Sequence, residues 1–452
     1  MKITAKLFTL LSAILLIPPA LAQTESAKPD SRFEIPATDA DLPGAGPMRR
    51  YDWFRKLWAQ RRSDWAKQIA QDQHAVVFLG DSITQGWGEN IGGAFAGMKV
   101  ANRGISGDTT RGVLIRLPED VLELHPSAVV ILIGTNDLEE QAEPETIAAN
   151  LKLILTALEK HNPRMPIVLC EVFPSSGSKK RPADKIKKLN QLYAATVKGD
   201  AQVTLMETWP LFAKTDGDAK LEEFPDVLHP NQTGYAQWAA ALRPVFATLG
   251  FLETTPDKFT PEPGFVSLFN GRDLTGWGFR PNSEADLQSA ASWKASDPNA
   301  PPWPIITRPR NFNGQTASDD GRYVAKNGRL IVTTPPEGRR IQQLWTTREF
   351  PKDFILKLEF RATPNADSGI FLRQPQLQCR DYLLAGPYKT LTKYKPQDWN
   401  EIIVTVKGGL AHCTCNGEVI EAACKVPATG PIGLEGDRGQ MEYRRIRIKE
   451  IR

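Results

Sequence analysis

The chain has 452 residues, enough for about two or three domains, and its 41% hydrophobic and 24% charged residues are ordinary for a globular protein. Its formal net charge of +4 is too weak a bias to indicate nucleic acid or an anionic membrane surface as a partner. Composition therefore excludes a strongly basic nucleic-acid binder, and the order of elements along the chain must indicate the function.

The N-terminus has the pattern of a secretory signal peptide. Lys2 and Lys6 precede an apolar run over residues 7–17, and Ala20-Leu21-Ala22 precedes Gln23. This run is shorter than the roughly 20 apolar residues that a membrane-spanning helix needs. We therefore predict a signal peptide at residues 1–22, cleavage after Ala22, a secreted or periplasmic location and no stable membrane insertion. Residues 23–46, rich in Pro, Ala and Asp, are expected to be a linker.

An amphipathic helix is predicted after this linker. Over residues 51–71, apolar side chains recur at three- and four-residue spacings among Arg and Lys. This pattern is typical of a helix with one core-facing stripe. We expect the aromatic residues of the segment, among them Trp53, Phe54, Trp58 and Trp65, to form that stripe.

Apolar runs alternate with helical patterns from residue 74 to residue 250. Strands are predicted at residues 75–79, 99–101, 128–133, 167–172 and 202–206, with helix-like segments between them. Near-continuous apolar strands that alternate with helices indicate a parallel sheet covered on both faces. We predict an α/β three-layer sandwich of the flavodoxin-like type over residues 47–252, with function at the C-terminal ends of its strands. The basic cluster at residues 179–188 is interpreted as a solvated loop and helix face.

The pattern changes after a proline-containing linker at residues 253–264. Residues 354–361 alternate apolar and polar side chains, as a half-buried strand does, and Asn327-Gly328 and Asn416-Gly417 are typical hairpin turns. Long helical periodicity is absent. Residues 265–452 are therefore predicted to form an all-β antiparallel sandwich.

The cysteines give little sign of disulfides or metal. Cys413 and Cys415 precede the turn at residues 416–417, and Cys424 lies several residues further down the predicted hairpin, beyond the roughly 7 Å Cα separation that a disulfide allows. A Cys-x-Cys pair with one nearby His is weak support for a metal site. We expect no disulfide within this hairpin and no metal site.

Four short blocks in the first domain carry reactive side chains. Three follow the first three predicted strands and one precedes the last helix: residues 80–84, 102–107, 134–137 and 226–230. Each block alone has a structural interpretation, with Ser82 as a helix N-cap, Gly104 as a residue with positive φ, Asn136 as a turn residue and His229 as a loop residue. A parallel sheet would nevertheless bring all four to one edge.

In this order the four blocks resemble the SGNH/GDSL hydrolase family over about residues 51–250. Serine is a poor nucleophile until a base removes its proton, and His229 is the histidine within a block that is placed to do so. Asp226, three residues earlier, can bond to the other imidazole nitrogen and fix its tautomer. We therefore expect Ser82, Asp226 and His229 to be the catalytic residues.

Attack on an acyl carbon creates an oxyanion, which needs preorganised hydrogen-bond donors. The resemblance implies that these are the backbone N–H groups of Ser82 and Gly104 and the side-chain amide of Asn136. Asp81 and Asp137 belong to the same signature and are expected to fix the loops rather than to react. His74, His125 and His161 match no block and are interpreted as structural or surface residues.

The second domain resembles the 3-keto-disaccharide hydrolase family, a concanavalin-like sandwich associated with carbohydrates. The resemblance rests on residues 265–277, 344–346, 367–373, 398–400 and 443–448. Where that family usually has Tyr-Glu-x-Gln, this chain has Pro375-Gln376-Leu377-Gln378, and a glutamine cannot exchange a proton as a carboxylate does. Glu435 stands near a position where the family often has a histidine. The resemblance therefore implies binding rather than catalysis in this domain.

Four residues of the second domain are candidates for a sugar platform: Trp345, Arg373, Gln378 and Trp399. The alternative is that the aromatic residues are simply buried between the sheets of the sandwich.

Together these features predict an exported serine esterase that removes small acyl groups, with acetyl preferred, from carbohydrate. The reaction would pass through a Ser82 acyl-enzyme and would need no metal or organic cofactor. The acetyl preference is implied by the resemblance to acetylhydrolase-like members, and carbohydrate by the attached sandwich. The alternatives are a lipid-directed acetylhydrolase, or a carbohydrate-binding protein with weak glycoside-directed activity in its second domain. The expected partner is an acylated carbohydrate or another small ester, and not nucleic acid.

Overall fold

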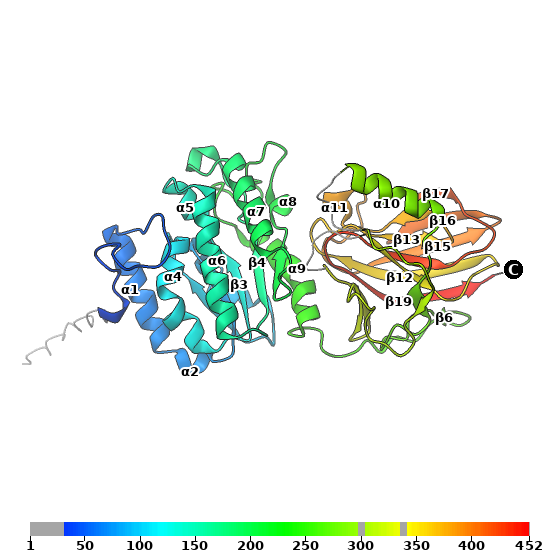
Figure 1. Cartoon of the computed structure of the whole chain (residues 1–452), viewed down its shortest axis with the longest axis horizontal. Coiled ribbons are helices and arrows are strands. Elements are labelled where there is room, and N and C mark those ends of the chain that lie inside the picture. Colours follow the sequence, from blue (N-terminus) through cyan, green and yellow to red (C-terminus); the bar gives the residue numbers. More distant parts are fainter. Residues whose placement is uncertain (1–30, 297–302, 335–340, 452) are drawn as a thin grey trace, which may run out of the picture.

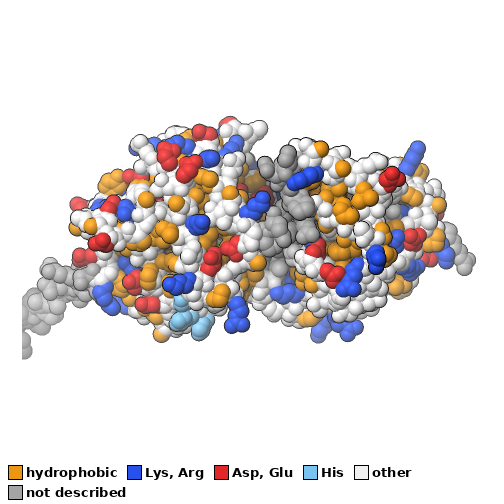
Figure 2. Space-filling view, in the orientation of Figure 1, with side chains coloured by type: hydrophobic (Ala, Val, Ile, Leu, Met, Phe, Trp, Pro, Cys, Tyr) orange, Lys and Arg blue, Asp and Glu red, His pale blue; other side chains and the backbone are white. Residues whose placement is uncertain are grey.

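The computed structural model describes residues 31–296, 303–334 and 341–451, so the predicted signal peptide lies outside the described residues. Two domains lie side by side along the long axis, a helix-covered sheet and a sandwich of sheets (Figure 1). Charged side chains of both signs are scattered over both domains on the face that Figure 2 shows, in keeping with the small net charge. Within these ranges no helix combines the length and the apolar character needed to cross a bilayer.

The first domain is built on a five-stranded parallel sheet with the strand order β2-β1-β3-β4-β5. The strands are β1 (Val76–Gly80), β2 (Val100–Gly104), β3 (Ala128–Leu132), β4 (Ile167–Cys170) and β5 (Val203–Met206). β1 and β3 are buried along their whole length because helices cover both faces of the sheet. The predicted three-layer α/β fold is confirmed.

The covering helices divide between the two faces of the sheet. One core layer lies under α4 (Thr110–Asp120), α6 (Pro144–His161) and α7 (Ala183–Val197), and the other lies under α9 (Gln232–Leu249). Short helices follow three of the strands: α3 (Ser82–Gly86), α5 (Thr135–Glu139) and α8 (Trp209–Phe212). The segments that carry the reactive blocks therefore meet at the C-terminal edge of the sheet.

The predicted amphipathic helix is α1 (Asp52–Ala66), and α2 (Ile69–Asp72) follows it. Phe54, Trp58 and Trp65 are buried in a small cluster with Ile105, as expected. The prediction is wrong for Trp53, whose side chain is 52% exposed. Consecutive helical residues are turned by about 100°, so Trp53 cannot share the face that Phe54 and Trp58 define.

The second domain is an antiparallel sandwich, as predicted. One sheet has the order β17-β16-β15-β12-β19-β10-β9, with β6 paired to β19, and the other has the order β14-β13-β18-β11-β7-β8. The strands are β6 (Val266–Ser267), β7 (Trp277–Phe279), β8 (Arg310–Asn311), β9 (Tyr323–Lys326), β10 (Arg329–Val332), β11 (Gln342–Thr346), β12 (Phe354–Ala362), β13 (Gly369–Leu372), β14 (Gln376–Gln378), β15 (Asn400–Lys407), β16 (Leu410–Cys415), β17 (Glu418–Lys425), β18 (Ile432–Gly436) and β19 (Met441–Glu450). The alternating residues of β12 bury their apolar side chains between the sheets.

Two helices interrupt the sandwich, α10 (Glu284–Ser296) and α11 (Tyr382–Ala385). The absence of helical periodicity led us not to expect α10. This helix buries little besides Ala290, so it has no apolar stripe that a periodicity search could detect. All five cysteines are free thiols.

The segment between the domains, expected to be a linker, is fastened to the outer face of the sandwich. Its acidic residues pair with arginines: Glu253 with Arg361 at 2.8 Å, Asp257 with Arg445 at 2.6 Å and Glu262 with Arg447 at 2.6 Å. A proline-containing composition alone does not reveal these partners.

The last turn of α9 is docked directly on the sandwich. Arg329 Nη2 donates to the carbonyl of Ala247 at 3.1 Å, and Gln440 Nε2 donates to the carbonyl of Pro244 at 3.1 Å. Lys326 donates to the carbonyl of Thr248. Cations at a helix C-terminus interact favourably with its unpaired carbonyls and its dipole.

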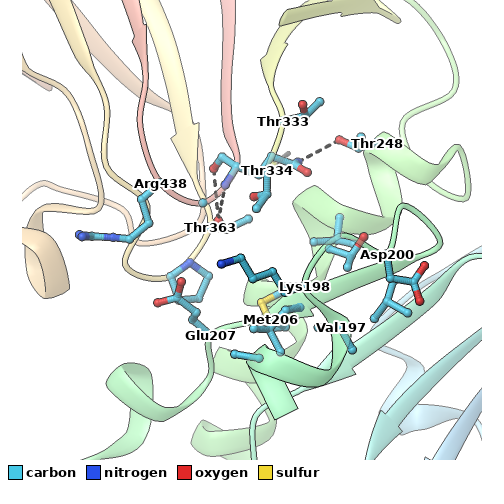
Figure 3. A pocket seen from close by; sticks show the side chains of 18 of the residues that line it. Val197, Lys198, Asp200, Met206, Glu207, Thr248, Thr333, Thr334, Thr363 and Arg438 are labelled. Atoms are coloured by element: carbon cyan, nitrogen blue, oxygen red, sulfur yellow. Dashed lines mark hydrogen bonds between the residues drawn. The ribbon is translucent and has the colours of Figure 1, made fainter. Parts of the chain in front are cut away.

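A cavity of about 550 Å³ lies between the domains, along the edge strand β5 (Figure 3). Lys198, just after α7, and Glu207, just after β5, line it from the first domain, and Thr363 and Arg438 line it from the second. Near this cavity Asn365 Nδ2 donates to Glu207 Oε2 at 2.9 Å, which adds a direct contact between the domains.

Candidate active site

The candidate nucleophile lies at a sharp turn between β1 and α3. Ser82 begins α3, and Asp81 caps this helix by accepting a hydrogen bond from the Ile83 N–H at 2.9 Å. A Cβ atom on Gly80 would lie 2.5 Å from the carbonyl oxygen of Leu132, so only glycine fits where the strand turns. The turn directs Ser82 toward the loop before α9, and Ser82 Oγ lies 3.0 Å from His229 Nε2.

The candidate base is held by its own loop. His229 Nδ1 lies 2.8 Å from Asp226 Oδ2, and the backbone N–H of His229 donates to Asp226 Oδ1 at 2.7 Å. Val227 adopts a positive φ of 56°, which folds the loop back so that one carboxylate reaches both groups. With the Nδ1 proton directed to Asp226, Nε2 is left to accept the proton of the Ser82 hydroxyl.

The pKa of Asp226 is lowered to about 2. Partial burial acts to raise it, but the hydrogen bonds from the backbone and ring of His229 and from the backbone of Leu228 outweigh that effect. Asp226 is therefore an anion at any pH at which the protein would work, and it stabilises an imidazolium at His229.

Asn136 lies in the first turn of α5, beside this pair of loops. Its Nδ2 donates to the carbonyl of Asp108 at 2.9 Å, which uses one of the two amide hydrogens and leaves the other. The Gly104 N–H, by contrast, donates to Asn102 Oδ1 at 2.8 Å. Of the expected oxyanion donors, Gly104 is thus already engaged within its own loop in this structure.

These geometries accompany clear similarities to known proteins. Residues 78–237 match the model of the GDSL-like lipase/acylhydrolase family, and residues 264–449 match that of the 3-keto-alpha-glucoside-1,2-lyase-like domain. Platelet-activating factor acetylhydrolase IB subunit alpha2 of Homo sapiens is 31% identical over 209 residues, which are 44% of this chain and 87% of that protein. The chain belongs to the GDSL-like lipase/acylhydrolase family. It is a hydrolase that acts on esters.

Other similar proteins match a similar share of this chain. The alpha1 subunit of the Rattus norvegicus acetylhydrolase is 30% identical over 199 residues, 42% of this chain and 83% of that protein. A solved GDSL-like lipase of Bacteroides thetaiotaomicron is 24% identical, with a TM-score of 0.38, and covers 41% of this chain and 97% of its own. Both resemblances inferred from the sequence are confirmed by the family matches.

Arg181 is a residue of this site that the sequence interpretation missed. It was assigned to a solvated basic cluster, but it is only 2% exposed. Its Nη2 donates to Asn136 Oδ1 at 3.0 Å and to Glu139 Oε2 at 2.8 Å, and its Nε donates to the carbonyl of Thr135 at 3.0 Å. The guanidinium thus fixes which end of the Asn136 amide faces the site. A buried arginine within a run of lysines has no sequence signature.

Tyr235, on the first turns of α9, was also not anticipated. Its hydroxyl donates to the carbonyl of Ile83 at 2.9 Å. This bond ties the helix that follows the His229 loop to the helix that begins at Ser82, and so it holds the two loops at a fixed separation.

Two buried carboxyl groups support the loops of the hydrolase. Burial raises the pKa of Asp81 to about 6 and that of Asp137 to about 7, against the lowering effect of hydrogen bonds from Ile83 and Thr110. Asp137 accepts from the backbone N–H of Thr110 at 3.0 Å and from its hydroxyl at 2.6 Å. These contacts are those of loop-fixing groups.

The remaining histidines of the first domain lie at its surface. The His74 and His125 rings are 6.4 Å apart, and those of His125 and His161 are 5.4 Å apart. They precede β1, β3 and β4, at the sheet edge opposite Ser82. The site itself is open, since the side chains of His229 and Asp226 are each 44% exposed.

Two of the four candidate sugar-platform residues lie on the same face of the sandwich. Trp345 on β11 and Gln378 on β14 share the outer face of one sheet, as the strand register requires. Arg373 is buried and donates to the backbone carbonyls of Pro427 and Lys352, each at 2.6 Å.

Trp399 lies immediately before β15 of the other sheet, and two arginines contact its ring. Arg444 and Arg361 lie 4.0 Å and 4.7 Å from the ring centre. The Trp399 ring is therefore engaged in cation–π contacts with β12 and β19 of the sandwich.

The outer face around Trp345 carries a second aromatic ring and an acid. Phe371 lies 5.0 Å from Trp345 between ring centres. Burial, reinforced by the charges of Asp437 and Asp367, raises the pKa of Glu435 to about 7, although a hydrogen bond from Gln376 opposes this. Glu435 thus places a carboxyl group on this face, although Gln376 stands where the resembled family usually has a glutamate.

Proposed function

We propose that this chain is an exported serine esterase that removes acetyl or similarly small acyl groups from carbohydrate. The observation that carries the proposal is the continuous chain of contacts from Ser82 through His229 to Asp226, at 3.0 Å and 2.8 Å, in a site open to solvent. A hydroxyl, an imidazole and a carboxylate bonded in this order are typical of a catalytic triad.

The first half of the reaction follows from this geometry. His229 Nε2 accepts the Ser82 proton while Ser82 Oγ bonds to the acyl carbon, and the resulting oxyanion accepts hydrogen bonds from the Ser82 N–H and the free Asn136 N–H. The imidazolium, stabilised by Asp226, then protonates the leaving alcohol as its bond to the acyl carbon breaks. The alcohol departs and the acyl group remains on Ser82 Oγ.

The second half repeats these steps with water. His229 Nε2 takes a proton from a water molecule, whose oxygen bonds to the acyl carbon, and the same donors stabilise the second oxyanion. The bond to Ser82 Oγ breaks and the serine recovers its proton from the imidazolium. A carboxylic acid is released.

Two features support a small acyl group on a carbohydrate. The similar subunits from Homo sapiens and Rattus norvegicus are named as acetylhydrolases. The attached domain matches a 3-keto-alpha-glucoside-1,2-lyase-like model and has Trp345 and Phe371 together on an outer face. A lipid-directed acetylhydrolase is the second candidate, because platelet-activating factor appears in the names of the same relatives.

The deciding experiment is a hydrolysis screen that measures released acid. Acetylated oligosaccharides, acetylated monosaccharides and short-chain acyl-glycerols are compared, with the Ser82→Ala variant as the control. We expect the acetylated sugars to be the best substrates and the Ser82→Ala variant to be inactive on all of them. A preference for acyl-glycerols would favour the lipid-directed alternative, and full activity of Ser82→Ala would overturn the nucleophile assignment.

Export is tested separately by the N-terminal sequence of the protein recovered from its producing cells. A mature chain that begins at Gln23 is expected from the pattern of residues 1–22.

A further inference from the structure

Two large aromatic side chains at the start of α1 are exposed to solvent. Tyr51 is 53% exposed and Trp53 is 52% exposed, and among the described residues no other Phe, Tyr or Trp is as exposed. Their ring planes are within 10° of parallel, with centres 6.4 Å apart. Large aromatic rings normally gain free energy by burial, as the neighbouring Phe54 does here. A pair left in water suggests a surface for a ligand.

Trp53 of this aromatic pair lies against the loop between β2 and α4, which contains Gly107. The tip of the Trp53 ring covers Gly107, where a Cβ atom would lie 2.7 Å from Cη2. On one side of Gly107, the Ser106 N–H donates to Gln85 Oε1 on α3 at 2.7 Å. On the other side, the carbonyl of Asp108 accepts from the Asn136 amide. Trp53 therefore packs on the loop whose flanking residues bond to the nucleophile helix and to the candidate oxyanion donor.

Ion pairs made by Arg49 also fix the segment that carries Tyr51 and Trp53. Arg49, two residues before Tyr51, pairs with Glu140 at 2.7 Å and with Glu139, and Glu139 also accepts from Arg181. The segment that carries the rings is thereby fastened to α5, which contains Asn136. In Figure 1, α1 lies on the side of the first domain away from the sandwich, so this surface is separate from the outer face around Trp345.

We propose that Tyr51 and Trp53 form a subsite that binds a sugar ring of the ester substrate, on the alcohol side of the scissile bond. This inference rests on the proposed function. The face of an aromatic ring carries negative electrostatic potential and attracts the polarised C–H groups that line one face of a pyranose. The exposed carboxylate of Asp52 can accept hydrogen bonds from the hydroxyl groups at the rim of such a ring.

An acyl chain fits this surface less well than a sugar does. Apolar ligands usually lose most of their surface to a deep pocket, whereas Tyr51 and Trp53 are each about half exposed. Shallow aromatic surfaces are suited to flat rings that keep their polar edges in water. The geometry therefore favours a sugar over a lipid tail.

The test compares two esters in the same variants of the full chain. We measure kcat and KM for an acetylated oligosaccharide and for ethyl acetate, which has no ring to stack. In Trp53→Ala the ratio of kcat/KM for the sugar ester to kcat/KM for ethyl acetate is expected to fall by about ten-fold, mainly through KM, and by more in the double variant with Tyr51→Ala. Trp53→Phe should recover most of the ratio. Leu153→Ala, which removes another exposed apolar side chain on α6, is the matched control and should leave it unchanged.

Equal losses of kcat/KM on both esters would overturn the proposal, because they would indicate a structural effect on the Gly107 loop. Unchanged kcat/KM on both esters would overturn it as well. To separate this test from the proposed function, binding of deacetylated oligosaccharide to Ser82→Ala is measured with and without Trp53→Ala. Trp53-dependent binding supports the subsite even if acetylated sugars prove not to be hydrolysed, and absence of such binding refutes it.

Discussion

Replacing Arg181 with methionine should impair the acylhydrolase without removing any atom that touches the substrate. The guanidinium donates to Asn136 Oδ1 and to Glu139 Oε2, at 3.0 Å and 2.8 Å, and it is buried. Methionine keeps most of the apolar stem and removes the planar donors. The Asn136 amide then keeps its bond to the Asp108 carbonyl but loses the partner that fixes its oxygen.

The size of the effect can be bounded. Removing an oxyanion donor outright costs a factor of about 10²–10³ in kcat, or about 2.7–4 kcal/mol. In Arg181→Met the donor is still present but no longer held, so we expect a smaller loss, about 10- to 100-fold in kcat, with KM little changed. Arg181→Lys should fall in the same range, because an ammonium cannot reproduce the planar fork.

A double-mutant cycle with Asn136→Ala tests the assignment. If Arg181 acts through Asn136, the variant that lacks both should be about as slow as Asn136→Ala alone. Lys180→Met, a neighbouring exposed cation, is the matched control and should behave as the unmodified enzyme. Additive losses in the cycle, or a loss of activity that follows a fall in Tm, would show that Arg181 supports the fold rather than the amide.

Three further predictions concern the acids. Asp226→Asn should lower kcat by about 10³- to 10⁴-fold because the imidazole loses its tautomer-fixing partner; since the pKa of Asp226 is about 2, Asp226 should add no inflection to the pH–rate profile above about pH 3, and an inflection between pH 3 and 6 that Asp226→Asn removes would contradict this. Asp137 has a pKa of about 7 when folded and about 3.9 when unfolded, so the folded state holds its proton more tightly and the stability it contributes is lost as pH rises from about 4 to 7. In urea titrations the wild type should therefore lose stability relative to Asp137→Asn over that range, by at most about 1.4 kcal/mol per pH unit, and parallel curves would refute the shifted pKa. Glu442→Gln breaks a buried pair with Arg361 (2.7 Å) and Arg329 (3.0 Å), and should destabilise the chain by about 3–5 kcal/mol while ethyl acetate turnover at low temperature is retained.

The elements of the fold were predictable where the signal is local. The apolar runs that became β1 and β3 are buried on both faces, and burial on both faces is what a continuous run requires. The reactive blocks follow these strands directly, so their approach at one edge follows from a parallel sheet. The predicted flavodoxin-like type implies the strand order β2-β1-β3-β4-β5, which is the order observed, although no single segment of the sequence encodes it.

Two of the missed features depend on tertiary partners. Arg181 belongs to the same run of positive charge as the lysines beside it until α5 covers it, and Trp53 shares its helix with three buried aromatic residues but not their face. The oxyanion role expected of the Gly104 N–H stays a prediction, and in the structure this N–H donates to the side chain of Asn102, two residues earlier. Such local side-chain competition for backbone donors is common for Asn and is not visible in a motif.

Helix α9 couples the candidate active site to the domain interface. At its start, Tyr235 bonds to the carbonyl of Ile83, beside Ser82. At its end, Arg329 and Gln440 of the sandwich bind the carbonyls of its last turns. The helix that follows the His229 loop is thus held by the hydrolase domain at its start and by the sandwich at its end. Cutting the chain at the linker would remove the donors that satisfy the α9 carbonyls.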